Sequence, residues 1–305
     1  MIKSDIAWIN GKLVPFAEAK VHVVTHTLHY GLAAFEGIRC YKRADGRSAV
    51  FRLREHIERL LVSAKIATMD CGYGREQLEK ACVDTLKANK LDEAYLRPLI
   101  YLGAGVLGLG ATSNPVDTAV IAFPWAPLLG EEGIKHGIRA HVSSFVRGHL
   151  NHTMSKGKIS GQYVNSVLAK REAQRLGFEE GIMLDSEGRV CEGSGENIFI
   201  LYKNRLYTPP LHLPILDGIT RDSVIVLARE AGIDLVEQTV TRDMLYAADE
   251  VFMTGTASEV TPVREIDARA IGDGRPGPIT RKLQQLFYAA ARGPGETHPE
   301  WLHWL

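Results

Sequence analysis

The chain has little cysteine and no excess of charge of either sign. Its 305 residues include four cysteines, Cys40, Cys71, Cys82 and Cys191, with no Cys-x-x-Cys pair and no metal-ligand spacing. We therefore expect buried or free thiols in a reducing compartment, and a cytoplasmic location. Lys plus Arg and Asp plus Glu both number 36, so the formal net charge is zero. This balance argues against a general nucleic-acid binder, which normally carries a basic patch.

Long hydrophobic runs are also missing. Lys3, Asp5 and Lys12 interrupt the first residues, so we expect no signal peptide. Residues 98–116 carry no charge, but they include four glycines and Pro115. Such a segment is too polar and too poor a helix former to span a bilayer, and we expect no membrane segment there.

The composition is that of a globular protein, with 45% hydrophobic and 24% charged residues. Asn10-Gly11 predicts a hairpin turn, and the apolar spacing of residues 54–67 predicts an amphipathic helix. A Pro- and Gly-rich stretch at 124–134 indicates an interdomain connection. We expect an α+β or mixed α/β fold with a smaller N-terminal domain (1–123) and a larger C-terminal domain (135–305). Further helices are expected at 75–89, 161–176, 219–231 and 278–291, and strands at 94–102, 118–123, 138–145, 181–184, 197–202, 234–240 and 249–253.

Two local patterns resemble functional motifs but lack the context that those motifs need. Residues 103–108 spell the dinucleotide fingerprint Gly-x-Gly-x-x-Gly, yet the following residues to Pro115 cannot form the helix that would hold a pyrophosphate. A Gly-rich loop is the better interpretation. His22, His26 and His29 lie close together, but residues 21–25 read as a strand that puts the three on no common face. We interpret them as structural histidines and expect no metal.

A lysine pair precedes the helix predicted at 161–176. Lys156 and Lys158 lie among small residues, in Ser-Lys-Gly-Lys-Ile-Ser-Gly. Most such pairs are solvated basic loops, but a Schiff-base lysine also needs slim neighbours against which a flat cofactor can lie. The residues alone do not choose between Lys156 and Lys158.

Two further segments could carry a cofactor. Glu192-Gly-Ser-Gly-Glu-Asn197 places carboxylates on a tight turn before a strand, where a carboxylate could cap the turn or hold a ring nitrogen protonated. Gly218 precedes the helix predicted at 219–231, so the backbone N–H groups of Ile219 and Thr220 lie at a helix N-terminus. That is a natural phosphate cradle, although an ordinary capped helix has the same pattern.

Taken together, these segments resemble the class IV (fold-type IV) pyridoxal-phosphate aminotransferases, which are D-amino acid aminotransferase-like in fold. The closest likeness is to bacterial branched-chain amino acid aminotransferases, and it extends over nearly the full chain. It rests on Glu192 through Phe199, Leu206-Tyr-Thr208, Leu216 through Arg221, His29-Tyr-Gly31, Phe35 through Arg39, Tyr95 through Pro98, Phe123-Pro-Trp125 and Glu250 through Ala257.

The resemblance implies a role for each matching residue. The Schiff-base lysine of the family lies five positions before the cofactor-contacting tyrosine, which implies Lys158 as the catalytic lysine and Tyr163 as that tyrosine. The same likeness implies pyridoxal 5'-phosphate as the cofactor, with Glu192 on the pyridine nitrogen. Arg59, Gly218, Ile219, Thr220 and Thr256 are implied at the phosphate; Tyr95, Arg97, Thr256 and Ala257 at the substrate carboxylates; and Tyr30, Phe35, Gly37 and Trp125 in the side-chain pocket.

The implied reaction moves the amino group of L-leucine, L-isoleucine or L-valine to 2-oxoglutarate, within branched-chain amino acid biosynthesis. A D-amino acid or (R)-amine transaminase and an aminodeoxychorismate lyase are alternatives of the same fold, and a nicotinamide-dependent oxidoreductase is a distant one. Leu128 stands where many relatives have tyrosine, and the loop at 105–110 also departs from the family, which leaves the substrate range open. The partners implied are small amino and keto acids and further copies of the chain, with sites near the subunit interface.

Overall fold

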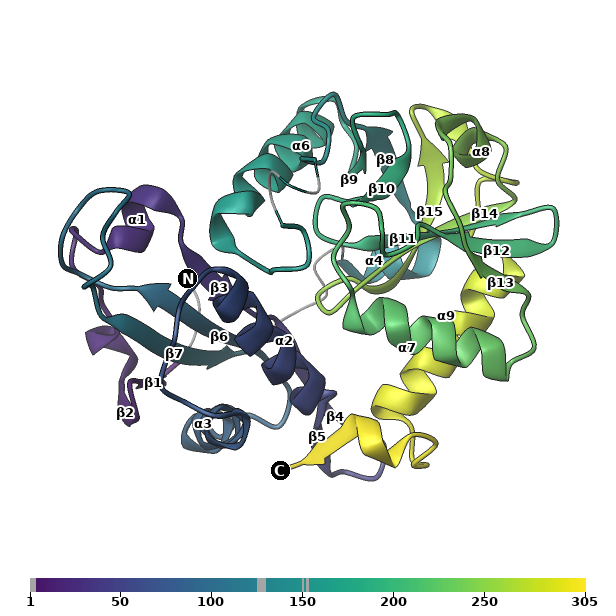
Figure 1. Ribbon diagram of the computed structural model, residues 1–305. Coiled ribbons are helices and arrows are strands. Elements are labelled where there is room, and N and C mark those ends of the chain that lie inside the picture. The colour runs from purple at the N-terminus through teal and green to yellow at the C-terminus, as the bar shows by residue number, and fades with distance from the viewer. Residues whose placement is uncertain (1–3, 125–129, 150, 152–153) are drawn as a thin grey trace. The chain divides into compact units, whose positions relative to one another are not determined.

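The computed structural model describes residues 4–124, 130–149, 151 and 154–305 (Figure 1). The chain forms two compact units. Unit 1 comprises Met1–Trp125, Gly157–Tyr163 and Ala290–Leu305, and unit 2 comprises Ala126–Lys156 and Val164–Ala289. These units differ from the expected domains, because residues 157–163 and 290–305 pack with the N-terminal part of the chain. Lys158 and Tyr163 thus belong to unit 1.

Unit 1 is built on an eight-stranded sheet among the described residues. Its strands lie in the order β17-β5-β4-β6-β7-β1-β2, with β3 also paired to β6, and every pairing is antiparallel. The last strand of the chain lies beside β5 (Figure 1). The strands are β1 (Ile6–Ile9), β2 (Lys12–Pro15), β3 (Ala33–Phe35), β4 (Ile38–Lys42), β5 (Ser48–Phe51), β6 (Ala94–Leu102), β7 (Val116–Phe123) and β17 (Leu302–Trp304).

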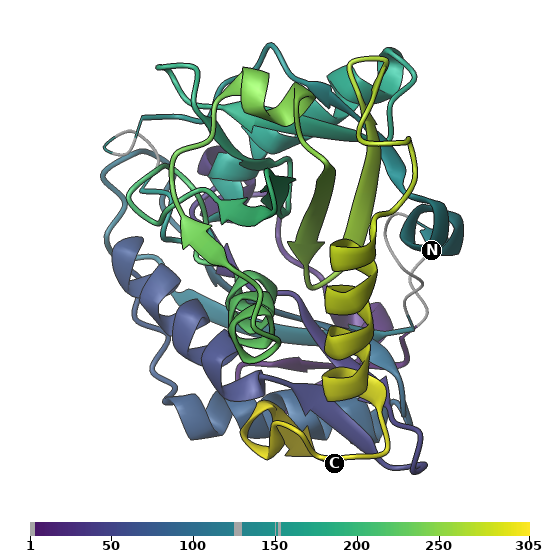
Figure 2. The ribbon, with the colours of Figure 1, turned by 90° about the vertical axis from the view of Figure 1, so that its right-hand side faces the viewer.

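The local sequence explains the first hairpin and the two long helices of unit 1. Asn10 and Gly11 both have positive φ, 46° and 90°, as a two-residue hairpin turn requires. Helices α2 (Leu53–Ile66) and α3 (Arg75–Ala88) lie side by side (Figure 2). Their apolar faces are buried in the unit 1 core with strand residues such as Ile38 and Leu96. The predicted hairpin and both predicted helices are confirmed.

Unit 2 contains a nine-stranded mixed sheet, again counting only described residues. Its order is β10-β9-β8-β15-β14-β11-β12-β13, with β16 paired to β15. Parallel pairs join β8 to β9, β8 to β15 and β12 to β13, so the mixed α/β expectation is confirmed. The strands are β8 (Ile138–Val142), β9 (Glu180–Leu184), β10 (Val190–Gly193), β11 (Asn197–Tyr202), β12 (Arg205–Thr208), β13 (Leu235–Glu237), β14 (Glu250–Gly255), β15 (Glu259–Ile266) and β16 (Arg269–Ala270).

Helices complete the fold at positions close to those predicted. The longer ones are α6 (Tyr163–Arg175), α7 (Ile219–Glu230) and α9 (Pro278–Arg292), and the shorter ones are α1 (His26–Tyr30), α4 (Gly130–His136) and α8 (Arg242–Tyr246). Short 3-10 turns lie at Phe16–Glu18, Ser160–Gln162 and Pro299–Trp301. Helix α7 packs on β13 and β14. No helix in the described parts of the chain is long and apolar enough to cross a bilayer.

One expectation about local structure was wrong. Residues 21–25 do not form a strand: they make a turn with one isolated bridge, from Thr25 to Ala104, and α1 begins at His26. The β-branched residues there favoured a strand, but the turn Thr25 N–H to His22 O closes instead. Within the connection expected at 124–134, α4 begins at Gly130. Residues 125–129 lie outside the described part of the chain.

A buried charged network joins the β3–β4 turn to α2. Glu36 is fully buried and accepts hydrogen bonds from Arg59 Nε at 2.6 Å, Arg59 Nη2 at 2.9 Å and His56 Nδ1 at 2.8 Å. Burial alone raises the pKa of Glu36, but the charges and hydrogen bonds of Arg59 and His56 outweigh it and hold this pKa well below its usual range. The network therefore fixes both the turn that carries Phe35 and Gly37 and the guanidinium of Arg59.

Replacing Glu36 should destabilise unit 1 in a pH-dependent way. We expect Glu36→Gln to lower the free energy of unfolding at neutral pH by about 3–5 kcal/mol, because a buried ion pair loses one partner. Since the folded-state pKa is depressed, this contribution is present above the ordinary carboxyl pKa and is lost as pH falls below it. Denaturant unfolding from about pH 7 to pH 3 measures both effects.

The exposed Glu76 on α3 provides the control, because 88% of its side chain is exposed. Glu76→Gln should leave the unfolding curve within about 0.5 kcal/mol of the parent at every pH. Equal stability of the parent and Glu36→Gln at neutral pH would contradict this account of the network.

Candidate functional site

In unit 1, Lys158 and Tyr163 form a close pair. The Lys158 amine lies 2.6 Å from the Tyr163 hydroxyl and 4.9 Å from the centroid of the Phe35 ring. The backbone around Lys158 is fixed on both sides: its N–H donates to the Ser63 hydroxyl at 2.9 Å, and its carbonyl accepts from the Phe35 N–H at 3.1 Å. An amine held against a phenol and an aromatic ring, both half-buried, can exchange protons with a bound group.

The two lysines that sequence chemistry left as alternatives have different surroundings. Lys156 belongs to unit 2, where its amine donates to the Ile215 carbonyl at 3.0 Å. Burial lowers the pKa of Lys156, against the opposing effect of the Asp217 and Glu192 charges. The Lys156 amine thus has a backbone partner, whereas that of Lys158 faces a titratable hydroxyl.

Arg97 and its neighbours form a second polar group in unit 1. Arg97 lies on β6, its Nη2 donates to the Tyr95 hydroxyl at 3.3 Å, and its guanidinium lies 4.8 Å from the centroid of the Phe35 ring. Arg97 Nε is buried and has no hydrogen-bond partner among the described residues. A Cβ on Gly37 would lie 1.8 Å from the Tyr95 hydroxyl oxygen, so no side chain fits at position 37 with Tyr95 in this place. The group offers donors for an anionic oxygen.

Tyr30 and Trp125 remain less defined. Tyr30 ends α1 and is 44% exposed, and its ring contacts those of His26 and His29 at centroid distances of 4.6 Å and 6.1 Å. Those two histidines bond backbone carbonyls of Gly108 and Val23, as structural histidines do. Trp125 and Leu128 lie outside the described residues. In the described ranges, no three His, Cys, Asp or Glu side chains gather as metal ligands would.

In unit 2, Glu192 is a buried carboxylate, and described residues donate to both of its oxygens. It lies on β10 and is 5% exposed. Oε2 accepts the Asn197 side-chain amide and the Leu216 N–H, each at 3.1 Å, and Oε1 lies 2.9 Å from Arg147 Nη2. These contacts favour the ionised carboxylate in a buried place. Such a group can hold a proton on an aromatic nitrogen.

Asn197 joins Glu192 to the start of α7. Its amide donates to the Leu216 carbonyl at 3.0 Å as well as to Glu192. Its Oδ1 would lie 1.9 Å from a Cβ on Gly218, so position 218 has no room for a side chain. The backbone N–H groups of Ile219 and Thr220 lie in the first turn of α7, where the helix dipole favours an anion. The predicted phosphate cradle therefore adjoins the segment that holds Glu192.

The turn between β14 and β15 contains Thr256 and Ala257 and is lined by unsatisfied hydroxyls. Thr254 Oγ1 and Ser258 Oγ are buried and have no hydrogen-bond partner in the described part of the chain. Thr254 and Ser258 are each only 1% exposed. Buried hydroxyls without a partner are uncommon and call for a bound polar group.

Sequence analysis missed three residues of these groups. Arg147 lies in the loop after β8 and no local pattern marks it, although it is one of the donors to Glu192. Glu36 belongs to the Phe35–Gly37 segment and Asn197 to the segment that begins at Glu192, but the sequence assigns neither residue a role of its own. The polar character of Glu36 and Asn197 beside otherwise apolar, buried strands is the feature that could have drawn attention to them.

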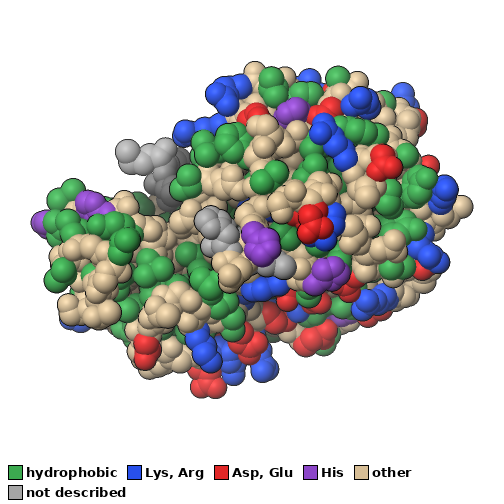
Figure 3. Space-filling model, turned by 45° about the horizontal axis from the view of Figure 1, so that its top comes forward, with side chains coloured by type: hydrophobic (Ala, Val, Ile, Leu, Met, Phe, Trp, Pro, Cys, Tyr) green, Lys and Arg blue, Asp and Glu red, His purple; other side chains and the backbone are tan. Residues whose placement is uncertain are grey.

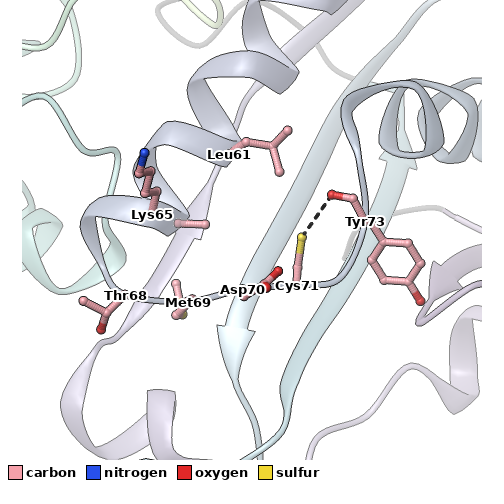
Figure 4. Close-up of a pocket in the computed structure, with 8 residues that line it drawn as sticks. Leu61, Lys65, Thr68, Met69, Asp70, Cys71 and Tyr73 are labelled. Carbon is pink, nitrogen blue, oxygen red and sulfur yellow. Dashed lines mark hydrogen bonds between the residues drawn. The ribbon is translucent and has the colours of Figure 1, made fainter.

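A surface hollow of about 390 Å³ lies elsewhere in unit 1 (Figure 4). It is formed by the end of α2 and the following loop, where Cys71 Sγ lies 3.7 Å from the Tyr73 carbonyl oxygen. Its described lining includes none of the predicted site residues. The lining consists of Leu61, Ala64, Lys65, Thr68, Met69, Asp70, Cys71 and Tyr73.

Comparison with known proteins identifies the family to which the chain is similar. A model of the amino-transferase class IV family matches residues 33–266. The branched-chain-amino-acid aminotransferase of Pseudomonas aeruginosa is 45% identical over 299 residues, which cover 98% of this chain and 97% of that protein.

Solved structures similar to this chain are of the same kind of protein as the curated relative. The crystal structure of the Escherichia coli branched-chain amino acid aminotransferase matches with a TM-score of 0.96 and 45% identity, over 98% of this chain and 99% of that one. The T.th. branched-chain amino acid aminotransferase with pyridoxamine 5'-phosphate matches with a TM-score of 0.95 and 43% identity, over 99% of both chains. That protein has also been solved with N-(5'-phosphopyridoxyl)-L-glutamate and with 4-methylvaleric acid.

The family match and the near-complete coverage of these relatives confirm the resemblance and the fold-type IV expectation. The chain belongs to the amino-transferase class IV family.

Proposed function

We propose that this chain is a pyridoxal-phosphate aminotransferase that moves the amino group of L-leucine, L-isoleucine or L-valine to 2-oxoglutarate, reversibly. The observation that carries the proposal is the 45% identity to branched-chain aminotransferases over 98% of the chain. A match of this length supports both the fold and the class of reaction.

The residues present fit the cofactor. The unsatisfied hydroxyls of Thr254 and Ser258, the backbone N–H groups in the first turn of α7 and the buried Glu192 are features that a bound phosphate and ring nitrogen would use. When bound, pyridoxal phosphate supplies an electron sink for the bond that breaks at the substrate Cα. We assign Glu192 to the ring nitrogen and Tyr163 to the ring hydroxyl. Arg59, Gly218, Ile219, Thr220 and Thr256 are assigned to the phosphate.

Lys158 is the catalytic residue of the proposal. Its amine would hold the cofactor, and as a free amine it would carry the proton that leaves the substrate Cα. The hydroxyl of Tyr163, 2.6 Å away, is placed to accept and return a proton from the same amine.

The proposed substrate pocket combines polar and aromatic groups of unit 1. Arg97 and Tyr95 offer donors to a carboxylate, while Phe35 offers an aromatic wall to an aliphatic side chain. We assign Tyr30, Gly37 and Trp125 to the same pocket, and Thr256 and Ala257 to the substrate carboxylates. The ligands seen in the T.th. relative, a glutamate adduct and a branched aliphatic acid, support one enzyme serving both kinds of substrate.

We further propose a cytoplasmic homo-oligomer. The four cysteines are free, as in proteins of reducing compartments. In unit 1, α1 and the loop at 103–110 are joined by the His26–Gly108 contact. Figure 3 shows hydrophobic side chains at the surface. Large exposed ones are Val23 in the turn before α1, Leu28 and Tyr30 on α1, and Val106, Leu107 and Leu109 in the loop. An apolar patch of this kind favours a subunit interface.

The visible spectrum tests the proposed cofactor and its lysine. The purified protein, supplied with pyridoxal phosphate, should absorb in the visible, and both L-leucine and L-glutamate should bleach that band. Lys158→Ala should lose the band and reduce transamination by about 10²–10⁴-fold or more, because it lacks both the cofactor amine and the proton carrier.

Lys156→Met is the matched control, because it removes the neighbouring amine that bonds the Ile215 carbonyl. It should keep the visible band. A protein that stays colourless with added pyridoxal phosphate contradicts the proposed cofactor, and bleaching by (R)-1-phenylethylamine but by neither amino acid contradicts the substrate class.

The proposed oligomer can be tested at Leu109, which is 90% exposed. The parent protein should sediment with at least twice the mass of one chain, and Leu109→Lys should shift it towards the monomer, since a buried interface tolerates an unpaired charge poorly. Leu176→Lys, at a 56% exposed leucine after α6, is the control and should not change the mass. A monomeric parent would contradict the proposal.

A further inference from the structure

We propose that Arg147 is a positioning residue that keeps the Glu192 carboxylate ionised and so places the shared proton on the cofactor ring nitrogen. The inference rests on the proposed function, since it concerns the ring partner of pyridoxal phosphate. It adds a residue that does not touch the cofactor and acts through Glu192.

The backbone and side chain of Arg147 are both fixed within unit 2. Its N–H donates to the Leu184 carbonyl at the end of β9, at 2.7 Å. Nη1 donates to the Ser166 hydroxyl on α6 at 3.0 Å, and Nη2 approaches the Gly193 carbonyl at 3.3 Å and Glu192 Oε1 at 2.9 Å. The Arg147 side chain is 16% exposed and that of Glu192 is 7% exposed. An ion pair so little exposed is weakly screened and strongly directional.

The surroundings of Glu192 are crowded with acidic groups, so a cation is needed there. Glu196, in the turn after β10, and Glu180, on β9, are both buried. Burial first, and then the charge of Glu180, raise the pKa of Glu196 to about 8, against the Lys170 charge and the Gly195 N–H. This shift favours the neutral form of the Glu196 carboxyl group.

Two ion pairs then balance the remaining carboxylates of this cluster. Lys170 on α6 pairs with Glu180 at 2.5 Å, and Arg147 pairs with Glu192. Lys156 and Asp217 add opposite charges further away. Removing Arg147 would take the paired cation from the buried Glu192 carboxylate and leave its amide donors, and such a carboxylate becomes a stronger base.

The basicity of Glu192 decides where a shared proton rests. A proton between a carboxylate and a pyridine nitrogen stays on the stronger base. Arg147 weakens Glu192 as a base, so the proton rests on the ring and the ring remains a strong electron sink. Without Arg147 the proton would move towards Glu192, and the chemical step would slow while substrate binding stayed similar.

The test uses the holoenzyme reconstituted with pyridoxal phosphate labelled with ¹⁵N in the ring. In the parent, the ¹⁵N resonance should be that of a protonated pyridine. In Arg147→Met it should move towards the unprotonated value, and kcat with L-leucine should fall about tenfold or more with KM within about threefold of the parent. Arg147→Lys, which keeps the charge, should retain the parent resonance and most of kcat.

Two further variants separate this role from a merely structural one. Arg139→Met removes an arginine of the same unit that pairs with Glu179 at 2.6 Å, and it should change neither the resonance nor kcat. In a Glu192→Gln background, Arg147→Met should leave the ring resonance where Glu192→Gln alone puts it, because the carboxylate through which Arg147 acts is absent.

The outcomes distinguish a failure of the inference about Arg147 from a failure of the proposed aminotransferase function. A folded Arg147→Met holoenzyme with the parent resonance and the parent kcat would overturn the inference and leave the aminotransferase intact. The same holds if Arg147→Met is poorly folded but folded Arg147→Lys shows an unprotonated ring. A parent protein that binds no pyridoxal phosphate would overturn the proposed function itself.

Discussion

The proposed cofactor site depends above all on how one buried carboxylate, Glu192, is held in place. Leaving a carboxylate almost without solvent is costly unless donors replace the water, and Arg147, Asn197 and the Leu216 N–H do so. The same contacts fix the approach to α7, because Asn197 also holds the Leu216 carbonyl and fills the space above Gly218. The proposed ring-nitrogen partner and phosphate cradle are thus parts of one hydrogen-bonded structure in unit 2.

Unit 1 also contains a buried carboxylate, that of Glu36, and a different hydrogen-bonded network stabilises it. Glu36 lies between His56 and Arg59, and its segment carries Phe35 and Gly37 on either side. A single buried charge therefore sets both the proposed pocket wall and the guanidinium proposed for the phosphate. The Lys158 amine, in turn, is set by backbone bonds to Ser63 and Phe35. In both units the proposed catalytic and binding groups are held by partners that themselves do no chemistry.

Much of the fold followed from local sequence. Asn10-Gly11 required a tight hairpin, and the helices at 53–66 and 219–230 followed from apolar spacing. Strand β15 was not among the strands predicted. It contains Pro262, which lacks an N–H and is unusual in mid-sheet, and its register with β8 is irregular between Val263 and Glu265. The prediction of a strand at 21–25 was wrong, because β-branched residues favour a strand only where a partner strand exists. Arg147 could not be found from sequence, because its partner is distant in the chain and only folding brings them together.

The most direct test of the central claim is the transfer of the amino group itself. The purified protein with pyridoxal phosphate would be incubated with ¹⁵N-labelled L-leucine and unlabelled 2-oxoglutarate, and the glutamate formed would be analysed by mass spectrometry. The account predicts ¹⁵N-labelled L-glutamate, with L-isoleucine and L-valine accepted within about 10–200-fold of L-leucine because a hydrophobic pocket distinguishes a methylene only weakly. Glutamate that stays unlabelled, or no glutamate at all, would contradict it.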